Sequence, residues 1–265
     1  MSLVSSWIFG CAVFLYAAAM IVSIWALARR SSRAVPWIPR ITAVGLVFHF
    51  AGLVRAALER SAILALSLRE ILFLLAFAAI SVYLLAHFKF RLEVMGVIIL
   101  PLIVALMGVT LLVPDEGSEA AQAWQVSLRA VHVIPAVLGA AFLFVTFTTS
   151  VIYLIQERGL KEHKPLRFFI SLPSLERCDR LNYLSLGWGF SFLTLVVVSG
   201  ALTNKYTHGD SSWVLREWYS LMAWLLFAVV IYDRVFAGRW RGRLSSYLSI
   251  IGFVAIILRM VGIGT

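Results

Sequence analysis

Two histidines and three arginines lie in or beside the long apolar stretches of this chain. His49 and Arg55 lie in the second stretch, His132 and Arg129 at the start of the fifth, and Arg259 near the end of the last. A charged side chain inside a membrane span costs about 2.5–3.5 kcal/mol on insertion scales. Each of these side chains therefore needs a partner or a function.

Imidazole and guanidinium groups together suit one class of ligand, an amphipathic anion with an apolar body. A neutral imidazole nitrogen binds iron, and a guanidinium donates paired hydrogen bonds to a carboxylate. Haem has both features. His49 and His132 are therefore the candidate axial ligands of a haem iron, and Arg55, Arg129 and Arg259 are candidate partners of its propionates.

The same residues also have structural interpretations. His49 would hydrogen-bond a neighbouring helix, and His132 would be a solvated residue at a helix start. Arg129 and Arg259 would extend their side chains to the lipid headgroups. Arg55 would pair with Glu59, four residues further along the same helix. The residues alone leave both interpretations open.

The elements that position these residues are membrane-spanning helices. The chain has 265 residues, of which 62% are hydrophobic and 14% charged, and its mean hydropathy is +0.93. A soluble domain of this size cannot bury so much apolar surface. We predict an all-α polytopic membrane protein with a single domain over 1–265 and about eight spans of some 20 residues. The predicted spans are 7–28, 41–58, 71–88, 92–113, 130–155, 183–202, 217–233 and 244–262.

The basic residues predict the orientation in the membrane. Sixteen of the 23 lysines and arginines collect in the first, third, fifth and seventh connections between the predicted spans. The positive-inside rule makes these connections cytoplasmic and both termini external. We expect a bacterial inner membrane, with the external side periplasmic. The net charge of +10 is then explained by anionic lipid as the partner, and no nucleic acid is expected.

Local patterns add three expectations. Cys11 and Cys178 are predicted to lie on opposite sides of the membrane, so no disulfide is expected. Ser174 precedes Leu175-Glu176 and is predicted to cap a short helix that leads into the sixth span. Pro135 is expected to kink the fifth span.

Three stretches of the second half resemble the cytochrome c assembly family of haem-handling membrane proteins, and most closely its small HemX-like branch. The first stretch contains Val131-His132-Val133 and Tyr153 to Arg158. The second contains Leu172 to Glu176, Gly187 to Phe190, Leu193-Thr194-Leu195 and Ser199-Gly200-Ala201. The third contains Arg216 to Leu221, Trp224-Leu225, Gly238 to Arg243 and Gly252-Phe253. In the first half, His49 followed by Arg55 resembles the second span of the small members.

The resemblance implies haem handling on the external face. His132 matches the external histidine that larger members use as a haem ligand. Trp213 and Glu217 match the end of their tryptophan-rich external segment, so that Trp213 and Trp218 are candidate packing partners of the porphyrin. Tyr232 stands where the larger members carry a membrane histidine.

We therefore expect a membrane protein that binds or passes haem in or beside cytochrome c maturation, with no catalysis by side chains, and with a second membrane protein as a possible partner. One alternative is a regulatory protein that docks a soluble enzyme of tetrapyrrole synthesis on its basic connection 156–182. Another is a transporter of a different organic anion, for which broken helices would be expected near the bilayer midplane.

Overall fold

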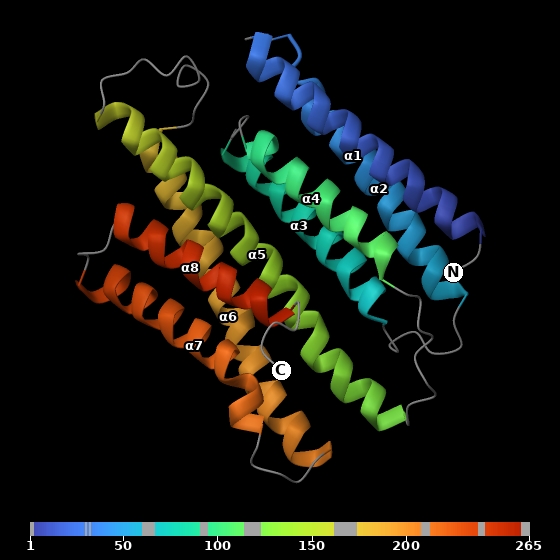
Figure 1. The fold of residues 1–265 in the computed structure, drawn as a ribbon, viewed down its shortest axis with the longest axis vertical. Helices are drawn as coiled ribbons and strands as arrows, with labels where there is room; N and C mark the ends of the chain where they lie inside the picture. Colours follow the sequence, from blue (N-terminus) through green and yellow to red (C-terminus); the bar gives the residue numbers. More distant parts are fainter. Residues whose placement is uncertain are drawn as a thin grey trace. The chain divides into compact units, whose positions relative to one another are not determined.

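The described part of the chain is all-helical. The computed structural model describes residues 3–29, 31, 33–59, 67–90, 95–113, 123–161, 174–207, 213–237 and 242–260. These residues form α-helices and one π-helix, and no strand occurs among them (Figure 1). The predicted all-α class is confirmed.

The elements follow one another as α1 (Leu3–Arg29), α2 (Trp37–Leu58), α3 (Leu68–Phe90), α4 (Met95–Leu112), α5 (Ala123–Lys161), α6 (Leu175–Thr207), α7 (Trp213–Tyr232), the π-helix η2 (Asp233–Ala237) and α8 (Arg243–Met260). Each predicted span overlaps one of these α-helices.

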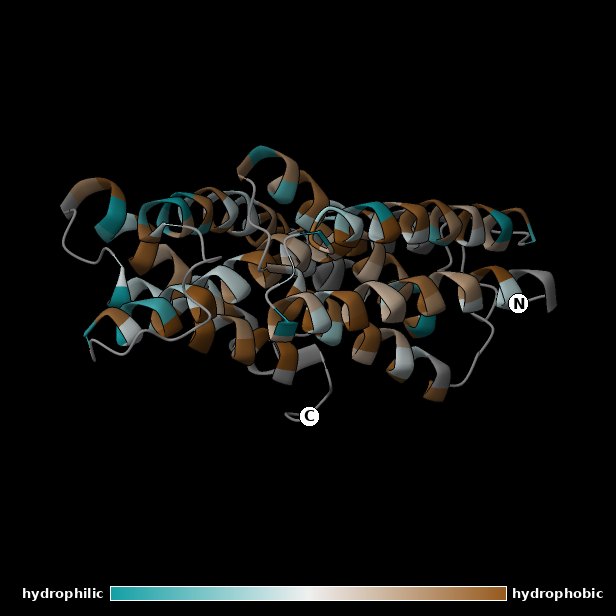
Figure 2. Ribbon diagram, turned by 90° about the horizontal axis from the view of Figure 1, so that it is seen from above, coloured by the Kyte–Doolittle hydropathy of each residue, from teal (hydrophilic) through white to brown (hydrophobic). Residues whose placement is uncertain are grey.

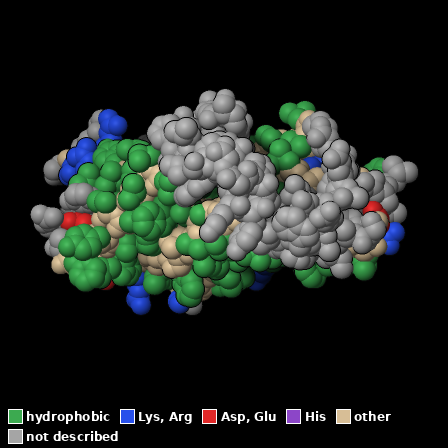
Figure 3. Space-filling model, turned by 90° about the horizontal axis from the view of Figure 1, so that it is seen from below, with side chains coloured by type: hydrophobic (Ala, Val, Ile, Leu, Met, Phe, Trp, Pro, Cys, Tyr) green, Lys and Arg blue, Asp and Glu red, His purple; other side chains and the backbone are tan. Residues whose placement is uncertain are grey.

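Within the described ranges, five helical segments are long and apolar enough to cross a membrane. They are Ser6–Arg29, Trp37–Leu58, Leu68–Phe90, Val131–Lys161 and Leu175–Leu202. Hydrophobic residues dominate the helices in Figure 2, and on the face drawn in Figure 3 the Lys and Arg side chains lie at the edges. Helices suit such sequences because every backbone group is hydrogen-bonded inside the segment. The chain is an integral membrane protein, whereas the number of eight spans and the side of the termini stay predictions.

Helix starts are set by local polar side chains. Before α3, the Glu70 carboxylate accepts the Ser67 backbone N–H at 2.8 Å, as in a capping box. Before α6, the Ser174 Oγ accepts the Arg177 backbone N–H at 3.4 Å, so the predicted cap is present. The segment after Ser174 is the first turns of α6 and no separate short helix, because the cap leads into one continuous helix from Leu175 to Thr207. Pro135 lies inside α5, which continues to Lys161.

The chain divides into two compact units, Met1–Val126 with Arg167–Pro173, and Ser127–Leu166 with Ser174–Thr265. In the first unit α1 packs on α2 and α4, and α3 packs on α2 and α4. Tyr16 of α1 lies against Gly45 of α2, where an added Cβ would be only 2.8 Å from its ring, and Phe9 lies in the same way against Gly52. The predicted single domain stays a prediction.

The second unit contains most of α5 together with α6, α7, η2 and α8. Its hydrophobic core is formed by Leu143, Leu186, Leu193, Phe227, Val230 and Phe253. Trp224 of α7 stacks on Phe190 of α6 with ring centroids 5.7 Å apart, and its Nε1 donates to the Thr194 Oγ1 at 2.9 Å. The indole of Trp224 therefore connects α6 and α7.

Candidate functional site

His49 is buried in the centre of the first unit. Its exposed fraction is 0%, and it lies near the middle of α2. Its Nδ1 lies 3.2 Å from the hydroxyl oxygen of Tyr16, on α1. Tyr16 reaches this position because it faces Gly45, one helical turn before His49, where only a glycine leaves room for the tyrosine ring.

Aromatic rings surround the rest of the imidazole. Phe9 of α1 and Phe73 and Phe77 of α3 contact it edge to face, with ring centroids 5.7, 6.2 and 5.6 Å from its own. Phe9 and Phe73 also stack on each other at 4.2 Å. Aromatic side chains of α1 and α3 thus surround a single polar ring of α2.

The second ring nitrogen of His49 has no hydrogen-bond partner among the described residues. This Nε2 is fully buried. The backbone of Phe73 is the nearest candidate acceptor for the imidazole, but it lies outside the distance and angle limits of a formed hydrogen bond. A buried polar atom without a hydrogen bond is uncommon and calls for an explanation. An imidazole that is held at one nitrogen by a hydroxyl and unbonded at the other is compatible with metal ligation, in which the second nitrogen binds the metal.

His132 lies in the second unit, on the outer half of α5 in the predicted topology. Its side chain is partly buried, and its Nδ1 lies 3.1 Å from the Oγ of Ser199 on α6. The ring passes close to Gly200, where an added Cβ would lie 3.3 Å from the imidazole Cε1. His132 is therefore held between helices, and the interpretation as a solvated helix-start residue is too simple.

Arg55 has the partner that its spacing predicts. Its Nε lies 3.0 Å from the Glu59 carboxylate, one turn further along α2, and 49% of the arginine side chain is exposed. The contact leaves the guanidinium at the surface, where an exposed pair contributes little stability. The same exposure allows Arg55 to bind an anionic group of a ligand.

The other predicted site residues lie outside the described side chains. Trp213, Glu217 and Trp218 belong to the backbone of α7, Arg129 to α5 and Arg259 to α8. His49 belongs to the first unit and His132 to the second. Of the basic connection 156–182, residues 162–173 lie outside the described chain.

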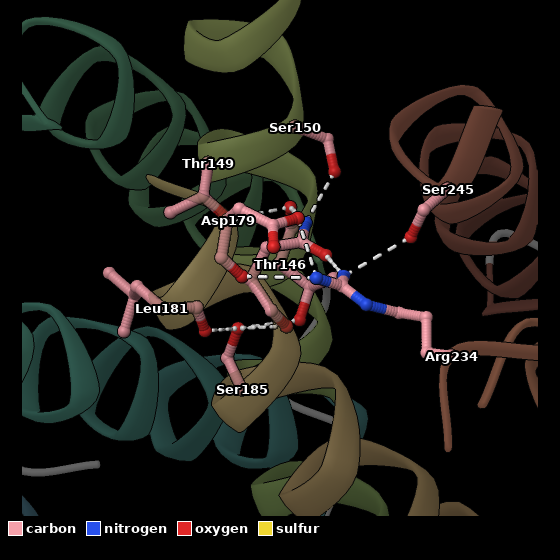
Figure 4. Close-up of polar contacts among 9 residues, drawn as sticks. Thr146, Thr149, Ser150, Asp179, Leu181, Ser185, Arg234 and Ser245 are labelled. Carbon is pink, nitrogen blue, oxygen red and sulfur yellow. Dashed lines mark hydrogen bonds and ion pairs between the residues drawn. The ribbon is translucent and has the colours of Figure 1, made fainter. Parts of the chain in front are cut away.

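Sequence reasoning missed a buried ion pair in the second unit. Arg234 of η2 was counted among the basic residues of a cytoplasmic connection, but only 4% of its side chain is exposed. Its Nη2 donates to the Asp179 carboxylate at 2.5 Å, and its Nη1 donates to the Asn182 Oδ1 at 2.9 Å and to the Ser245 Oγ at 3.2 Å (Figure 4). One guanidinium thus connects η2 to both α6 and α8.

The network extends to α5 through the amide of Asn182. Its Nδ2 donates to the Ser150 Oγ at 2.7 Å and to the Thr146 carbonyl at 3.1 Å. Thr146 in turn donates to the Ser185 Oγ at 2.8 Å. The polar groups around Arg234 are therefore bonded to one another, and this cluster stabilises the end of the unit opposite His132.

The π-helix explains why Arg234 is placed inward. The chain changes from α7 to η2 at Asp233, directly after Tyr232. A π-turn adds a residue to the helical repeat and so changes the direction of the side chains that follow, often at functional positions. Tyr232 is 64% exposed, whereas Arg234 points into the unit. No hydropathy pattern signals such a turn.

The described residues contain no group of three or more His, Cys, Asp or Glu side chains placed to hold a metal ion. Haem iron needs fewer protein ligands, because the porphyrin supplies four nitrogen ligands and the protein supplies only one or two axial ligands. Both cysteines are free thiols, Cys11 exposed and Cys178 buried.

Comparison with known proteins gives a consistent result over most of the chain. Residues 65–265 match the family described as Cytochrome C assembly protein. The relatives include the cytochrome c biogenesis protein CcsA of Heterosigma akashiwo, which is 28% identical over 233 residues that cover 74% of this chain and 72% of that protein.

Two further relatives carry the same name. CcsA of Chlamydomonas reinhardtii is 29% identical over 205 residues, which cover 74% of this chain and 57% of that protein. CcsA of Guillardia theta is 25% identical over 197 residues, which cover 67% of this chain and 65% of that protein. No solved structure matches the chain.

Proposed function

Because this chain belongs to the cytochrome c assembly protein family, we propose that it acts in cytochrome c maturation by binding or passing haem on the external side of the membrane. The relatives named above are cytochrome c biogenesis proteins. We further propose that it belongs to the small HemX-like branch and resides in a bacterial inner membrane, where a second membrane protein would complete the site.

The observation that carries the haem proposal is the buried Nε2 of His49, which has no hydrogen-bond partner among the described residues. Neutral imidazole is a common protein ligand of haem iron, and an apolar pocket suits the porphyrin. Haem when bound would supply the redox chemistry of its iron. The residues of the chain would bind the haem, orient it and exclude water.

The roles of the individual residues follow from their contacts. His49 would present its Nε2 to iron from a wall formed by Phe9, Phe73 and Phe77. Phe77 is only partly buried, so it is the side chain that would move to admit a ligand. His132 would serve a haem on the external side, with Trp213 and Trp218 against the porphyrin. Arg55, Arg129 and Arg259 would bind propionates, and Glu217 would lie beside them.

The test is haem binding by the detergent-purified full chain. We expect a Soret band and saturable binding after haem addition, with lower haem occupancy in His49→Ala and in His132→Ala than in the wild type. His87→Ala is the control and should keep wild-type occupancy. His87, near the end of α3 in the same unit, also has a buried ring nitrogen without a hydrogen-bond partner among the described residues, but its side chain is only partly buried. Binding that is not saturable, or equal occupancy in all the variants, would refute the haem proposal.

A further inference from the structure

Two contacts of the Ser199 hydroxyl bear on which ring nitrogen of His132 carries the hydrogen. The serine is buried, with 7% of its surface exposed, and lies on α6. Its Oγ donates to the Val196 carbonyl of its own helix at 3.2 Å, and the same Oγ lies 3.1 Å from the His132 Nδ1. A hydroxyl has one hydrogen to donate and two lone pairs that accept.

The direction of the contact between helices follows. Both contacts are formed at once only if the Ser199 hydroxyl donates its single hydrogen to the Val196 carbonyl and its Oγ accepts from the imidazole. The His132 Nδ1 must then carry a hydrogen, and in the neutral ring the lone pair lies on Nε2. The geometry thus selects one tautomer of the neutral histidine.

Gly200 fixes the ring against α6. An added Cβ at this position would lie 3.3 Å from the His132 Cε1 and 3.6 Å from its Nδ1. The close approach keeps Nδ1 within reach of the serine beside it. Ser199 therefore sets the direction of the hydrogen bond, and Gly200 allows the distance.

The hydroxyl that contacts His49 has, in the described chain, no second hydrogen-bond partner of the kind that Val196 provides for Ser199. The Tyr16 hydroxyl has no other hydrogen-bond partner among the described residues besides the His49 Nδ1. It can therefore donate to the ring or accept from it, and the tautomer of His49 is not selected by the contact.

We propose that Ser199 is the positioning residue of His132, which it holds as the Nδ1–H tautomer with the lone pair on Nε2. That this lone pair serves haem iron rests on the proposed function. A histidine that donates its other N–H to a fixed acceptor is oriented and made more basic, and loss of such a partner typically lowers metal affinity 10–100-fold.

The first experiment reads the tautomer without haem. The full chain is labelled with ¹⁵N-histidine, purified in detergent and studied by NMR, and the His132 signals are identified by their loss in His132→Ala. We expect the neutral ring of the wild type to carry its hydrogen on Nδ1. Ser199→Ala should lose this preference, and Ser199→Thr, which restores a hydroxyl, should recover it.

Two variants of α6 complete the set. Ser191→Ala is the matched control, because the Ser191 Oγ also donates to a carbonyl of its own helix, that of Gly187 at 3.0 Å, but Ser191 is exposed. It should leave the tautomer unchanged. Gly200→Ala should push the ring away and weaken the preference. A wild-type ring with its hydrogen on Nε2, or a Ser199→Ala protein with the hydrogen still on Nδ1, would overturn the proposal.

The second experiment adds haem to the same variants. Ser199→Ala should bind haem 10–100-fold more weakly and shift its reduction potential, whereas Ser199→Thr and Ser191→Ala should match the wild type. If His132→Ala binds haem normally, the proposed role of His132 in haem binding fails, while the NMR result still decides the tautomer. If His132→Ala loses haem but Ser199→Ala keeps normal affinity and potential, the positioning role fails alone.

Discussion

At the scale of the residue, His49 combines full burial with a ring nitrogen that has no hydrogen-bond partner among the described residues. This combination distinguishes a haem ligand from a histidine that only links two helices. A histidine that serves only to link helices would use both ring nitrogens. Here one nitrogen contacts Tyr16 and the other has no hydrogen-bond partner in the described chain. Leaving such an atom buried costs about 1–3 kcal/mol. A structural role gains nothing from this cost, but a ligand site requires the atom to be available.

The double variant Tyr16→Phe with His49→Leu tests this distinction. Replacing both partners of a buried hydrogen bond by apolar groups of similar shape can be neutral or stabilising. We expect the thermal midpoint of the haem-free protein to stay within about 2 °C of the wild type or to rise, while haem binding is lost. Light-scattering melts in detergent, beside His87→Ala, measure the first effect. A drop of more than about 8 °C would show that His49 is mainly structural.

Sequence reasoning could identify His49 and His132, because a polar side chain at membrane depth is conspicuous in an apolar stretch. It could not identify Tyr16 and Ser199, which contact the two histidines from positions 33 and 67 residues away. Such contacts depend on the register between two helices, and hydropathy carries no information on register. Glycines at 45 and 200 set the close approaches, but a glycine in a span has many other uses.

At the scale of the element, the π-helix η2 and its guanidinium hold three helices together. Arg234 bonds to Asp179 and Asn182 on α6 and to Ser245 on α8. Hydropathy predicted where these helices run, and the helices extend beyond the predicted spans: α5 continues to Lys161 and α6 begins at Leu175. It also assigned Arg234 to a cytoplasmic connection, since the change to a π-turn has no signature in composition.

Removing the guanidinium should loosen this end of the second unit. In Arg234→Met, Asp179 and Asn182 lose the guanidinium, and we expect the free energy of unfolding to fall by about 2–4 kcal/mol. The loss is smaller than for a fully buried pair, because 31% of the Asp179 side chain is exposed. Cys178, adjacent to Asp179 and 1% exposed, reports the opening. In a Cys11→Ser background, its labelling rate by a maleimide should rise at least tenfold.

The control for this prediction is the exposed pair of Lys161 with Glu157, in which 61% of the lysine side chain is exposed. Lys161→Met should leave Cys178 labelling unchanged, because exposed pairs contribute little. Equal labelling in Arg234→Met and the wild type would mean that the hydrophobic core alone holds these helices.

At the scale of the whole molecule, orientation in the membrane decides on which side each feature acts. The positive-inside rule predicts that both termini and His132 lie outside and that the Arg234 cluster lies inside. The long apolar helices are present in the structure, but the side of the membrane is set by charges in the connections. This part of the prediction rests on the sequence alone.

Paired reporter fusions test the orientation. Alkaline phosphatase fused after Thr265 should be active and green fluorescent protein at the same point dark, because the first folds only outside and the second fluoresces only inside. Fusions after Lys161 should give the opposite pair of signals. A fluorescent fusion at Thr265 would place His132 on the cytoplasmic side and refute haem handling on the external face.

The pairing of α1 with α2 limits how this molecule can vary in length. Phe9 and Tyr16 are seven residues apart, as are Gly45 and Gly52, and each ring lies on one glycine. A repeat of seven residues is the period of a left-handed supercoil. In such a pair one helix can shift along the other only by whole heptads, about 10 Å each. Inserting one residue between Phe9 and Tyr16 would turn one ring about 100° off its glycine. Relatives that keep Tyr16 beside His49 should therefore change the length of this pair in steps of seven residues.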